Sequence, residues 1–200
     1  MTALAPTAPR RLVLADRVFP RHLVVDAVLV VLGAALVGGF AQLYVPLWPV
    51  PVTGQTLAVL LVGATLGAVR GVLALTAYAV FGIIGVPWFS EASSGWNVIA
   101  GPTGGYIVGF IVAAALVGWL SERAWDRKIL KALATFAGGT LVVFAIGLPW
   151  LAFALGIGVD LTLEYGLYPF LIGGAIKALI AAALLPLAWF GANKLEKRSE

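Results

Sequence analysis

The sequence predicts an all-α integral membrane protein with six transmembrane helices. Of its 200 residues, 62% are hydrophobic and 11% charged, and the mean hydropathy is +1.03, which is typical of membrane proteins. The charges are also unevenly placed, because ten of the 22 charged residues lie before residue 22 or after residue 193. A net charge of +4 in such a chain indicates orientation in a membrane rather than nucleic-acid binding.

Six apolar stretches follow one another between these charged ends. Crossing a hydrocarbon core takes about 20 apolar residues in a helix, with about 17–25 as the usual range. The expected spans cover, approximately, residues 25–43, 55–69, 71–86, 104–120, 132–158 and 168–193.

Each span has a recognisable boundary. The first stops before a proline cluster that begins at Pro46, since prolines remove backbone donors and bias their neighbours to extended conformations. The second and third are short, and Arg70 is expected to mark the turn between them. The fourth ends in the charged cluster 121–131, the fifth carries Pro149, and the sixth ends where the charged tail starts.

The basic residues predict the topology. With the N-terminus in the cytoplasm, 12 of the 13 Lys and Arg residues fall on the inner side, as the positive-inside rule requires. The outer loops, about 44–54, 87–103 and 159–167, carry only acidic charges: Glu91, Asp160 and Glu164. We therefore expect a basic cytoplasmic segment over 1–24, a single six-helix membrane domain over 25–193, and a charged cytoplasmic tail over 194–200.

Several residue types are missing, and their absence excludes function classes. There is no cysteine and only one histidine, so disulfides, thiolate sites, histidine metal clusters and a Ser-His hydrolase are excluded. Residues 1–21 carry basic residues without a long apolar core, so no signal peptide is expected.

Lys177 is the exception among the basic residues. It lies about 13 Å below the outer end of the sixth span, at 1.5 Å per residue. An ammonium at such depth costs about 2.5–3.5 kcal/mol, so it is expected to face a cavity or a partner, with inter-helix water or carbonyls as the structural alternative. Gly173 and Gly174 lie on the same helical face and leave space beside it. This arrangement suits a pocket for a carboxylate.

Two outer loops contain candidate ligand-binding residues. Loop 87–103 is long and combines aromatic faces with neutral polar groups, which suits a small ligand that is partly apolar and partly amide-like. Its aromatic residues would also suit a membrane-interface belt. The segments 49–56 and 101–106 open the second and fourth spans, where free N–H groups cap a helix or bind a carbonyl or anion. The candidates in these loops are Thr53, Gln55, Trp96, Asn97, Thr103, Gly104 and Tyr106.

Small residues form two pairs in the first span. Ala34 with Gly38, and Ala35 with Gly39, have the four-residue spacing that allows close helix approach. Either internal packing or docking on another membrane subunit would explain them.

Nothing in the chain supplies energy for transport. None of its lysines stands in a phosphate-binding glycine loop, and neither an internal repeat nor a second intramembrane charge is evident. These features predict a membrane-embedded binding subunit that is not an enzyme, needs no cofactor, and is driven by other polypeptides.

The chain resembles the BioY proteins, the biotin-specific S components of energy-coupling-factor (ECF) transporters. The resemblance rests on PVPVTGQTLAVLLVGA (49–64), GIIGVPWF (82–89), GPTGGYIVGF (101–110) and PFLIGGAIKALIAA (169–182). It implies a prokaryotic cell-membrane protein that captures biotin at the outer face. The implied partners are a transmembrane coupling subunit of the EcfT or BioN type and ABC ATPases of the EcfA or BioM type, which alone would use ATP.

The resemblance also implies residue roles. Lys177 looks like the family's lysine in the sixth span, Asn97 and Tyr106 fall where the vitamin pocket is lined, and the small residues of the first span are similar to the docking face. Many members carry an Asp where this chain has Gly174, so the ureido N–H groups need another acceptor: Asn97, or Asp160 or Glu164. The alternatives are uptake of another vitamin-like carboxylate, or a channel or membrane enzyme.

Overall fold

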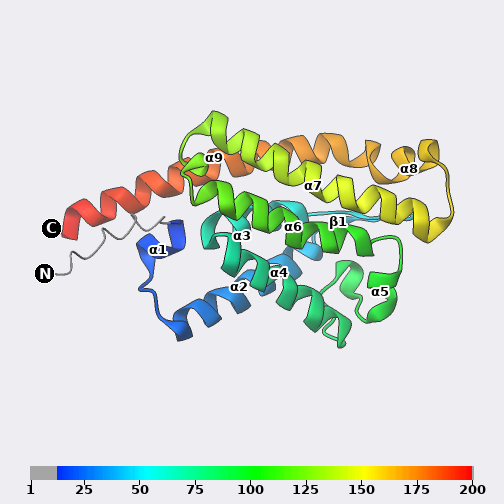
Figure 1. The fold of residues 1–200 in the computed structure, drawn as a ribbon, viewed down its shortest axis with the longest axis horizontal. Coiled ribbons are helices and arrows are strands. Elements are labelled where there is room, and N and C mark those ends of the chain that lie inside the picture. The colour runs from blue at the N-terminus through cyan, green and yellow to red at the C-terminus, as the bar shows by residue number, and fades with distance from the viewer. Residues whose placement is uncertain (1–12, 200) are drawn as a thin grey trace, which may run out of the picture.

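The computed structural model describes residues 13–199, which form a bundle of helices running along one long axis (Figure 1). Arg10, Arg11 and the rest of residues 1–12 lie outside the described residues, as does Glu200. The α-helices are α1 (Leu14–Val18), α2 (Leu23–Ala41), α3 (Gln55–Leu66), α4 (Ala68–Ile83), α5 (Trp96–Ala100), α6 (Gly104–Ser121), α7 (Ile129–Leu155), α8 (Val159–Gly166) and α9 (Tyr168–Ser199). Two 3-10 turns, η1 (Ser90–Ala92) and η2 (Trp125–Arg127), and a small antiparallel hairpin of β1 (Tyr44–Val45) and β2 (Val52–Thr53) complete the fold.

The prediction of an all-helical membrane protein is confirmed. Within residues 13–199, four helices are long and apolar enough to cross a membrane: α2, α6, α7 and α9. The apolar helices α3 and α4 are shorter, with 12 and 16 residues. Each of the six predicted stretches thus contains one helix, and Pro149 lies inside α7 as expected.

Helix α6 is the central element of the bundle. In its membrane-length window 61% of residues are buried, against 22–28% in the windows of α2, α7 and α9. It packs on α3, α4 and α7, while the other long helices turn large apolar side chains such as Leu141 and Phe153 outward. An exposed apolar surface of this kind suits lipid rather than water.

The turn between the second and third stretches differs from the prediction. The helices break at Gly67, where φ is +86°, whereas Arg70 lies inside α4. A side chain is strained at such a φ, so glycine is the residue that fits the break. Gly118 on α6 lets the turn approach closely, since a Cβ there would lie 2.3 Å from the Ala68 nitrogen. Glu122 then accepts a hydrogen bond from that nitrogen at 2.9 Å.

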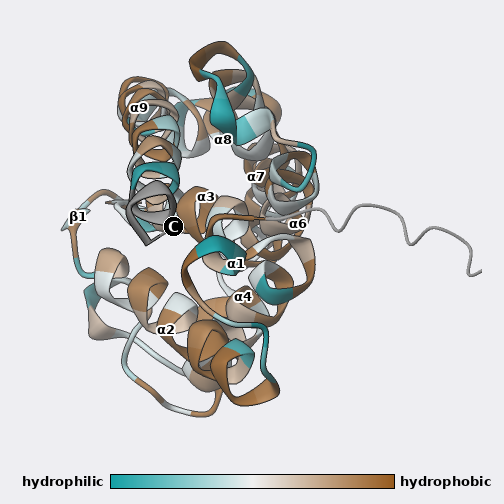
Figure 2. Ribbon diagram, turned by 90° about the vertical axis from the view of Figure 1, so that its left-hand side faces the viewer, coloured by the Kyte–Doolittle hydropathy of each residue, from teal (hydrophilic) through white to brown (hydrophobic). Residues whose placement is uncertain are grey.

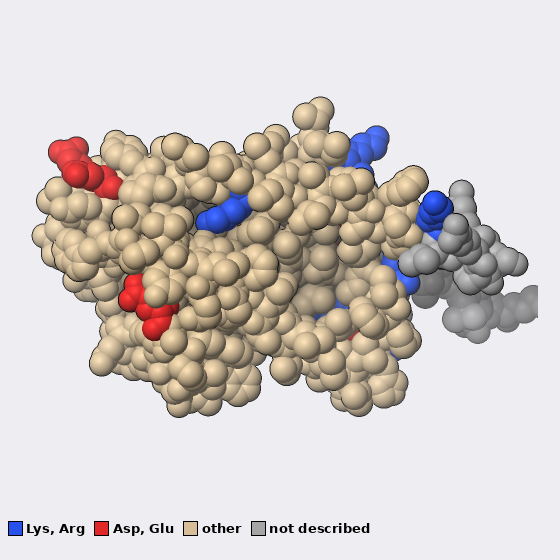
Figure 3. Space-filling view, turned by 180° about the vertical axis from the view of Figure 1, so that it is seen from behind, with Lys and Arg blue, Asp and Glu red and all other residues tan. Residues whose placement is uncertain are grey.

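The two ends of the bundle differ in charge. We call the end with α1, the Gly67 turn, η2 and the last turns of α9 the basic end, and the end with α5 and α8 the acidic end (Figure 1). Seen from behind, acidic side chains gather toward one end and most basic ones toward the other, and the mostly uncharged surface between them shows a basic side chain (Figure 3). This separation matches the charge pattern of the sequence.

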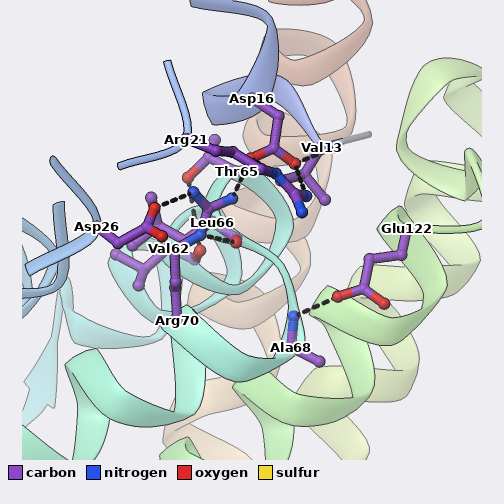
Figure 4. A network of polar contacts seen from close by, with 10 residues as sticks. All are labelled: Val13, Asp16, Arg21, Asp26, Val62, Thr65, Leu66, Ala68, Arg70 and Glu122. Atoms are coloured by element: carbon purple, nitrogen blue, oxygen red, sulfur yellow. Dashed lines mark hydrogen bonds and ion pairs between the residues drawn. The ribbon is translucent and has the colours of Figure 1, made fainter. Parts of the chain in front are cut away.

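An ionic network fixes α1 at the basic end (Figure 4). The Asp16 side chain, 1% exposed, accepts hydrogen bonds from Arg21 and, at 2.8 Å, from Arg70. Arg70 also pairs with Asp26 on α2 at 2.8 Å, so α1, α2 and α4 are joined. Burial alone would raise the pKa of Asp16, but the hydrogen bonds from both arginines outweigh it and hold the pKa below its ordinary value. As a result α1 packs across the ends of α3 and α9 (Figure 2).

A second buried carboxylate lies in η2. Asp126 is 0% exposed, and its Oδ2 accepts a hydrogen bond from Trp189 Nε1 on α9 at 2.6 Å. The Arg127 guanidinium lies 4.1 Å from the centre of the Trp189 ring. Burial raises the pKa of Asp126 above its ordinary value, because the charged form loses its hydration. The contact with Trp189 ties the loop between α6 and α7 to α9.

Candidate ligand-binding cavity

A cavity with a largely apolar wall lies among α3, α6, α7 and α9. Its volume is about 50 Å³, and it is partly open to solvent. Ligand pockets in proteins commonly combine apolar walls with a few placed polar groups. The lining residues are Val50, Pro51, Thr53, Gln55, Thr56, Phe89, Ser90, Val98, Thr103, Tyr106, Ile107, Phe110, Thr140, Val143, Phe144, Phe170, Gly174 and Lys177. All of them belong to the described part of the chain, and Lys177 is the one charged residue among them.

The Lys177 ammonium is anchored at the start of α3. It donates to the Thr53 carbonyl at 2.5 Å and to the Thr56 hydroxyl at 3.2 Å. An ammonium has three donors, so these two contacts leave one for a ligand. Its side chain comes from α9, so it joins two helices that are far apart in sequence. Lys177 lines a cavity, as the sequence led us to expect, and it also binds a carbonyl, as in the structural alternative.

A chain of buried hydrogen bonds extends from this lysine. The Thr53 hydroxyl donates to Gln55 Oε1 at 2.8 Å, and Gln55 Nε2 donates to the Tyr78 hydroxyl at 2.6 Å. The backbone N–H of Gln55, the first residue of α3, donates to Thr53 Oγ1 at 3.2 Å. Tyr78 is 0% exposed, so its hydroxyl needs a partner inside the protein. These bonds fix Thr53 and Gln55 in the wall, while Gly54 is the N-cap residue of α3.

Three aromatic rings form the opposite wall. Tyr106 on α6 stacks on Phe170 with ring centres 6.1 Å apart, and Phe144 on α7 meets both rings edge-on. The Tyr106 hydroxyl donates to the Gly166 carbonyl at 3.0 Å. It is therefore the ring of Tyr106, not its hydroxyl, that is free to contact a ligand.

Gly174 leaves room beside the ammonium. A Cβ placed there would meet only Thr140 Cγ2, at the ordinary contact distance of 3.9 Å. Polar oxygens near this space come from Thr140, Thr53 and Gln55, which all line the cavity. The acceptors close to the lysine are therefore neutral.

A second hollow lies beside the first at the acidic end. Its volume is about 260 Å³, and it shares Pro51, Ser90, Val98 and Thr103 with the cavity. Asn97 lines this outer hollow and not the cavity. The two hollows together form a path from the loop 87–103 toward Lys177.

The structure separates the predicted site residues into groups. Those in the cavity wall are Lys177, Thr53, Gln55, Thr103 and Tyr106. Gly104 instead provides close packing, since a Cβ there would lie 1.7 Å from the Ile99 carbonyl oxygen. Trp96 is 64% exposed, and Asp160 and Glu164 are exposed on α8, away from both hollows.

The small residues of α2 form one buried pair and one exposed pair. Ala34 and Gly38 are buried, and a Cβ on Gly38 would lie 3.0 Å from Trp88. Ala35 and Gly39 are exposed, with nothing within 4 Å of a Cβ on Gly39. Internal packing thus explains the first pair, and the second remains free for a partner.

Several wall residues were not singled out from the sequence. Thr56, Thr140, Phe144 and Phe170 sit in helices whose composition is uniformly apolar or small, so hydropathy gives no signal for them. Thr56 alone had a usable signal, since it belongs to the same capping segment as Thr53.

Comparison with known proteins gives consistent results. The model of the BioY family matches residues 11–194. The biotin transporter BioY2 of Lactococcus lactis subsp. cremoris is 37% identical over 152 residues, covering 76% of this chain and 83% of that protein. The probable biotin transporter BioY of Pyrococcus horikoshii is 36% identical, covering 78% and 91%. The fold is similar to the crystal structure of the S-component for biotin from an ECF-type ABC transporter, with a TM-score of 0.73, 23% identity, and coverage of 82% and 89%.

Proposed function

The chain belongs to the BioY family, and on that premise we propose that it is the membrane subunit that binds biotin for uptake. Curated relatives at 36–37% identity are named as biotin transporters, and this multi-pass membrane protein has the fold of an S component. The observation that carries the proposal is the cavity itself, where one lysine faces an otherwise uncharged wall. Biotin is a carboxylate with an apolar bicyclic body and a ureido group, and the cavity offers a counterpart to each part.

Lys177 supplies the charge complement. Its remaining donor either pairs with the valerate carboxylate or binds the ureido carbonyl, and both are charge-assisted interactions. The rings of Tyr106, Phe144 and Phe170 cover the apolar bicycle. Oxygens of Thr53, Gln55 or Thr140 accept from the ureido N–H groups, in the place of a carboxylate at Gly174. Asn97 belongs to the outer hollow, so it contacts biotin during access or at the mouth of the site.

The acidic end faces outward in this proposal, and both termini are cytoplasmic. Six membrane crossings by α2, α3, α4, α6, α7 and α9 fit the distribution of Lys and Arg. Because the chain has no cysteine, single cysteines report sidedness without background. In intact cells an impermeant maleimide should label Asp160→Cys and not Lys128→Cys. The reverse pattern would overturn this orientation.

Transport itself requires partners. We propose a transmembrane coupling subunit of the EcfT or BioN type and ABC ATPases of the EcfA or BioM type, with ATP used only by those ATPases. Ala35 and Gly39 on α2 provide an exposed small-residue strip on which a partner helix can pack closely.

Co-purification tests the function. The chain, co-expressed with a coupling subunit and ABC ATPases, should co-purify with them. It should also retain biotin, detected by mass spectrometry. Lys177→Met should lose the biotin, and Lys194→Met, which changes an exposed lysine far from the cavity, should keep it. A panel of competing carboxylates separates biotin from other vitamins, because a lone ammonium in a neutral wall would also accept another acid. Displacement of biotin by an unrelated vitamin at equal concentration would contradict biotin specificity.

A further inference from the structure

The loop that covers the cavity is held by a residue outside it. We propose that Gln42 is a positioning residue that keeps residues 88–92 in the shape that closes the cavity over its ligand. The inference rests on the proposed function for the identity of that ligand. Gln42 directly follows α2 and lies 46 residues or more before the loop that it contacts.

The side-chain amide of Gln42 forms hydrogen bonds with several backbone groups of the loop. Its Nε2 donates to the carbonyls of Phe89 at 2.9 Å and Trp88 at 3.3 Å, and also to Gly38 at 3.1 Å in its own helix. Its Oε1 accepts from the Ala92 N–H at 3.0 Å. One amide therefore satisfies backbone groups on both sides of the turn η1. The glutamine amide has both N–H donors and a carbonyl acceptor, whereas leucine has neither and ionised glutamate has no donor.

The held segment is part of both hollows. Phe89 and Ser90 line the cavity, and Ser90 and Glu91 line the outer hollow. The Phe89 ring is fixed against α4, where a Cβ at Gly82 would lie 2.1 Å from it. Phe89 is therefore the anchored edge of the loop, and the residues after it form the part that can lift from the opening.

The backbone of this part is strained. Glu91 and Ala92 have φ values of 61° and 51°, in the left-handed region that non-glycine residues rarely adopt. Such conformations persist when the surroundings hold them. The hydrogen bond from Ala92 to Gln42 is a direct restraint on the second of these residues. Without it, the loop is free to relax to an unstrained and more open shape.

Apolar packing at the same place reinforces the contact. Trp88 packs on Gly38, and its indole N–H donates to the Tyr78 carbonyl at 2.8 Å. The base of the loop is thereby fixed to α2 and α4. Gln42 adds the restraint on the far side of the turn, which Trp88 does not reach.

The test uses the chain's lack of cysteine. In a Ser90→Cys background, the rate of maleimide labelling without ligand measures how often the loop opens. Gln42→Leu removes the donor and the acceptor at similar size, and should raise that rate about fivefold, as expected for losing hydrogen bonds at an exposed site. Leu43→Ala is the matched control, because Leu43 is an exposed neighbour with no part in the cavity wall, and it should leave the rate unchanged.

Ligand kinetics without the cysteine give the second readout. Gln42→Leu should speed biotin dissociation about fivefold while association stays within about twofold, a split that a general loss of fold would not produce. Gln42→Glu keeps an acceptor for Ala92 but loses the donor, so it should give an increase even if Gln42→Leu does not fold. Labelling and dissociation within about twofold of the parent in the folded variants would overturn the proposal. If the parent binds no biotin, the proposed function fails, and the labelling comparison still tests Gln42.

Discussion

Replacing Lys177 by methionine tests which part of the ligand the ammonium holds. Methionine keeps the length and the apolar stem and removes the charge, and Thr53 and Thr56 lose only a donor. Lys177 is the one charged residue among the described residues of the cavity wall, so a bound carboxylate in the variant has no cation beside it. A hydrogen bond to a charged group contributes about 1.5–3 kcal/mol, which predicts biotin binding weakened about 10- to 150-fold.

Comparing biotin with a second ligand, biotinamide, shows which group of biotin Lys177 contacts. Biotinamide has the same rings and ureido group but no carboxylate. If Lys177 pairs with the carboxylate, the parent should bind biotinamide more weakly by a similar factor, and Lys177→Met should hardly change its affinity. If Lys177 binds the ureido carbonyl, the variant should lose affinity for both ligands equally.

Isothermal titration or equilibrium dialysis of the purified proteins gives the four dissociation constants. Lys194→Met serves as the control for loss of a lysine from the same helix and should match the parent. Unchanged affinity of Lys177→Met for both ligands would refute the reasoning, since the ammonium would then have no role in binding.

Four further predictions follow from the packing and the charged groups. Asp16→Asn should lower the melting temperature by a few degrees near neutral pH, because the pKa of Asp16 is lowered and its stabilisation is present above its ordinary value of 3.8; the difference should shrink as the pH falls below that value. Asp126→Asn should instead raise the melting temperature near neutral pH and not below pH 3.8, because the pKa of Asp126 is raised and its ionisation destabilises the fold; a lower melting temperature at neutral pH would contradict this. Gly118→Val should sharply reduce the yield of folded protein, since its Cβ would lie 2.3 Å from a backbone nitrogen, whereas Gly138→Val, whose Cβ meets only a side chain at 3.8 Å, should be tolerated in the same size-exclusion assay. Gly39→Leu should abolish co-purification with the coupling subunit and leave biotin affinity unchanged; retained co-purification would show that the partner packs elsewhere.

Hydropathy and charge predicted much of the fold because both are local properties of the chain. Helices α2, α3, α4, α6, α7 and α9 lie within six residues of the expected stretches, whereas α1, α5 and α8 lie outside them. The partly buried Lys177 stands out in the sequence by its depth in the sixth stretch. The break between α3 and α4 was placed three residues too late, since Arg70 is a conspicuous charge while Gly67 acts through its backbone conformation. In the sequence the charge of Arg70 is the stronger signal, but Gly67 makes the turn.

The site was predictable only where a residue is unusual for its surroundings. Lys177, Thr53 and Gln55 are polar residues beside or within apolar stretches, and all three line the cavity. Gln42 contacts a loop 46 or more residues away, and a single sequence carries no information about such pairings. Asp160 and Glu164 were expected as possible acceptors for the ureido group, but α8 holds them on the exposed side.

Saturable biotin binding by the purified chain alone is the most direct measurement of the central claim. Titration of detergent-solubilised protein with biotin should show one site per chain with a dissociation constant in the nanomolar to micromolar range. Lys177→Met should weaken that site at least about tenfold. Absence of saturable binding by folded, monodisperse parent protein would contradict the assignment of this chain as a biotin-binding subunit.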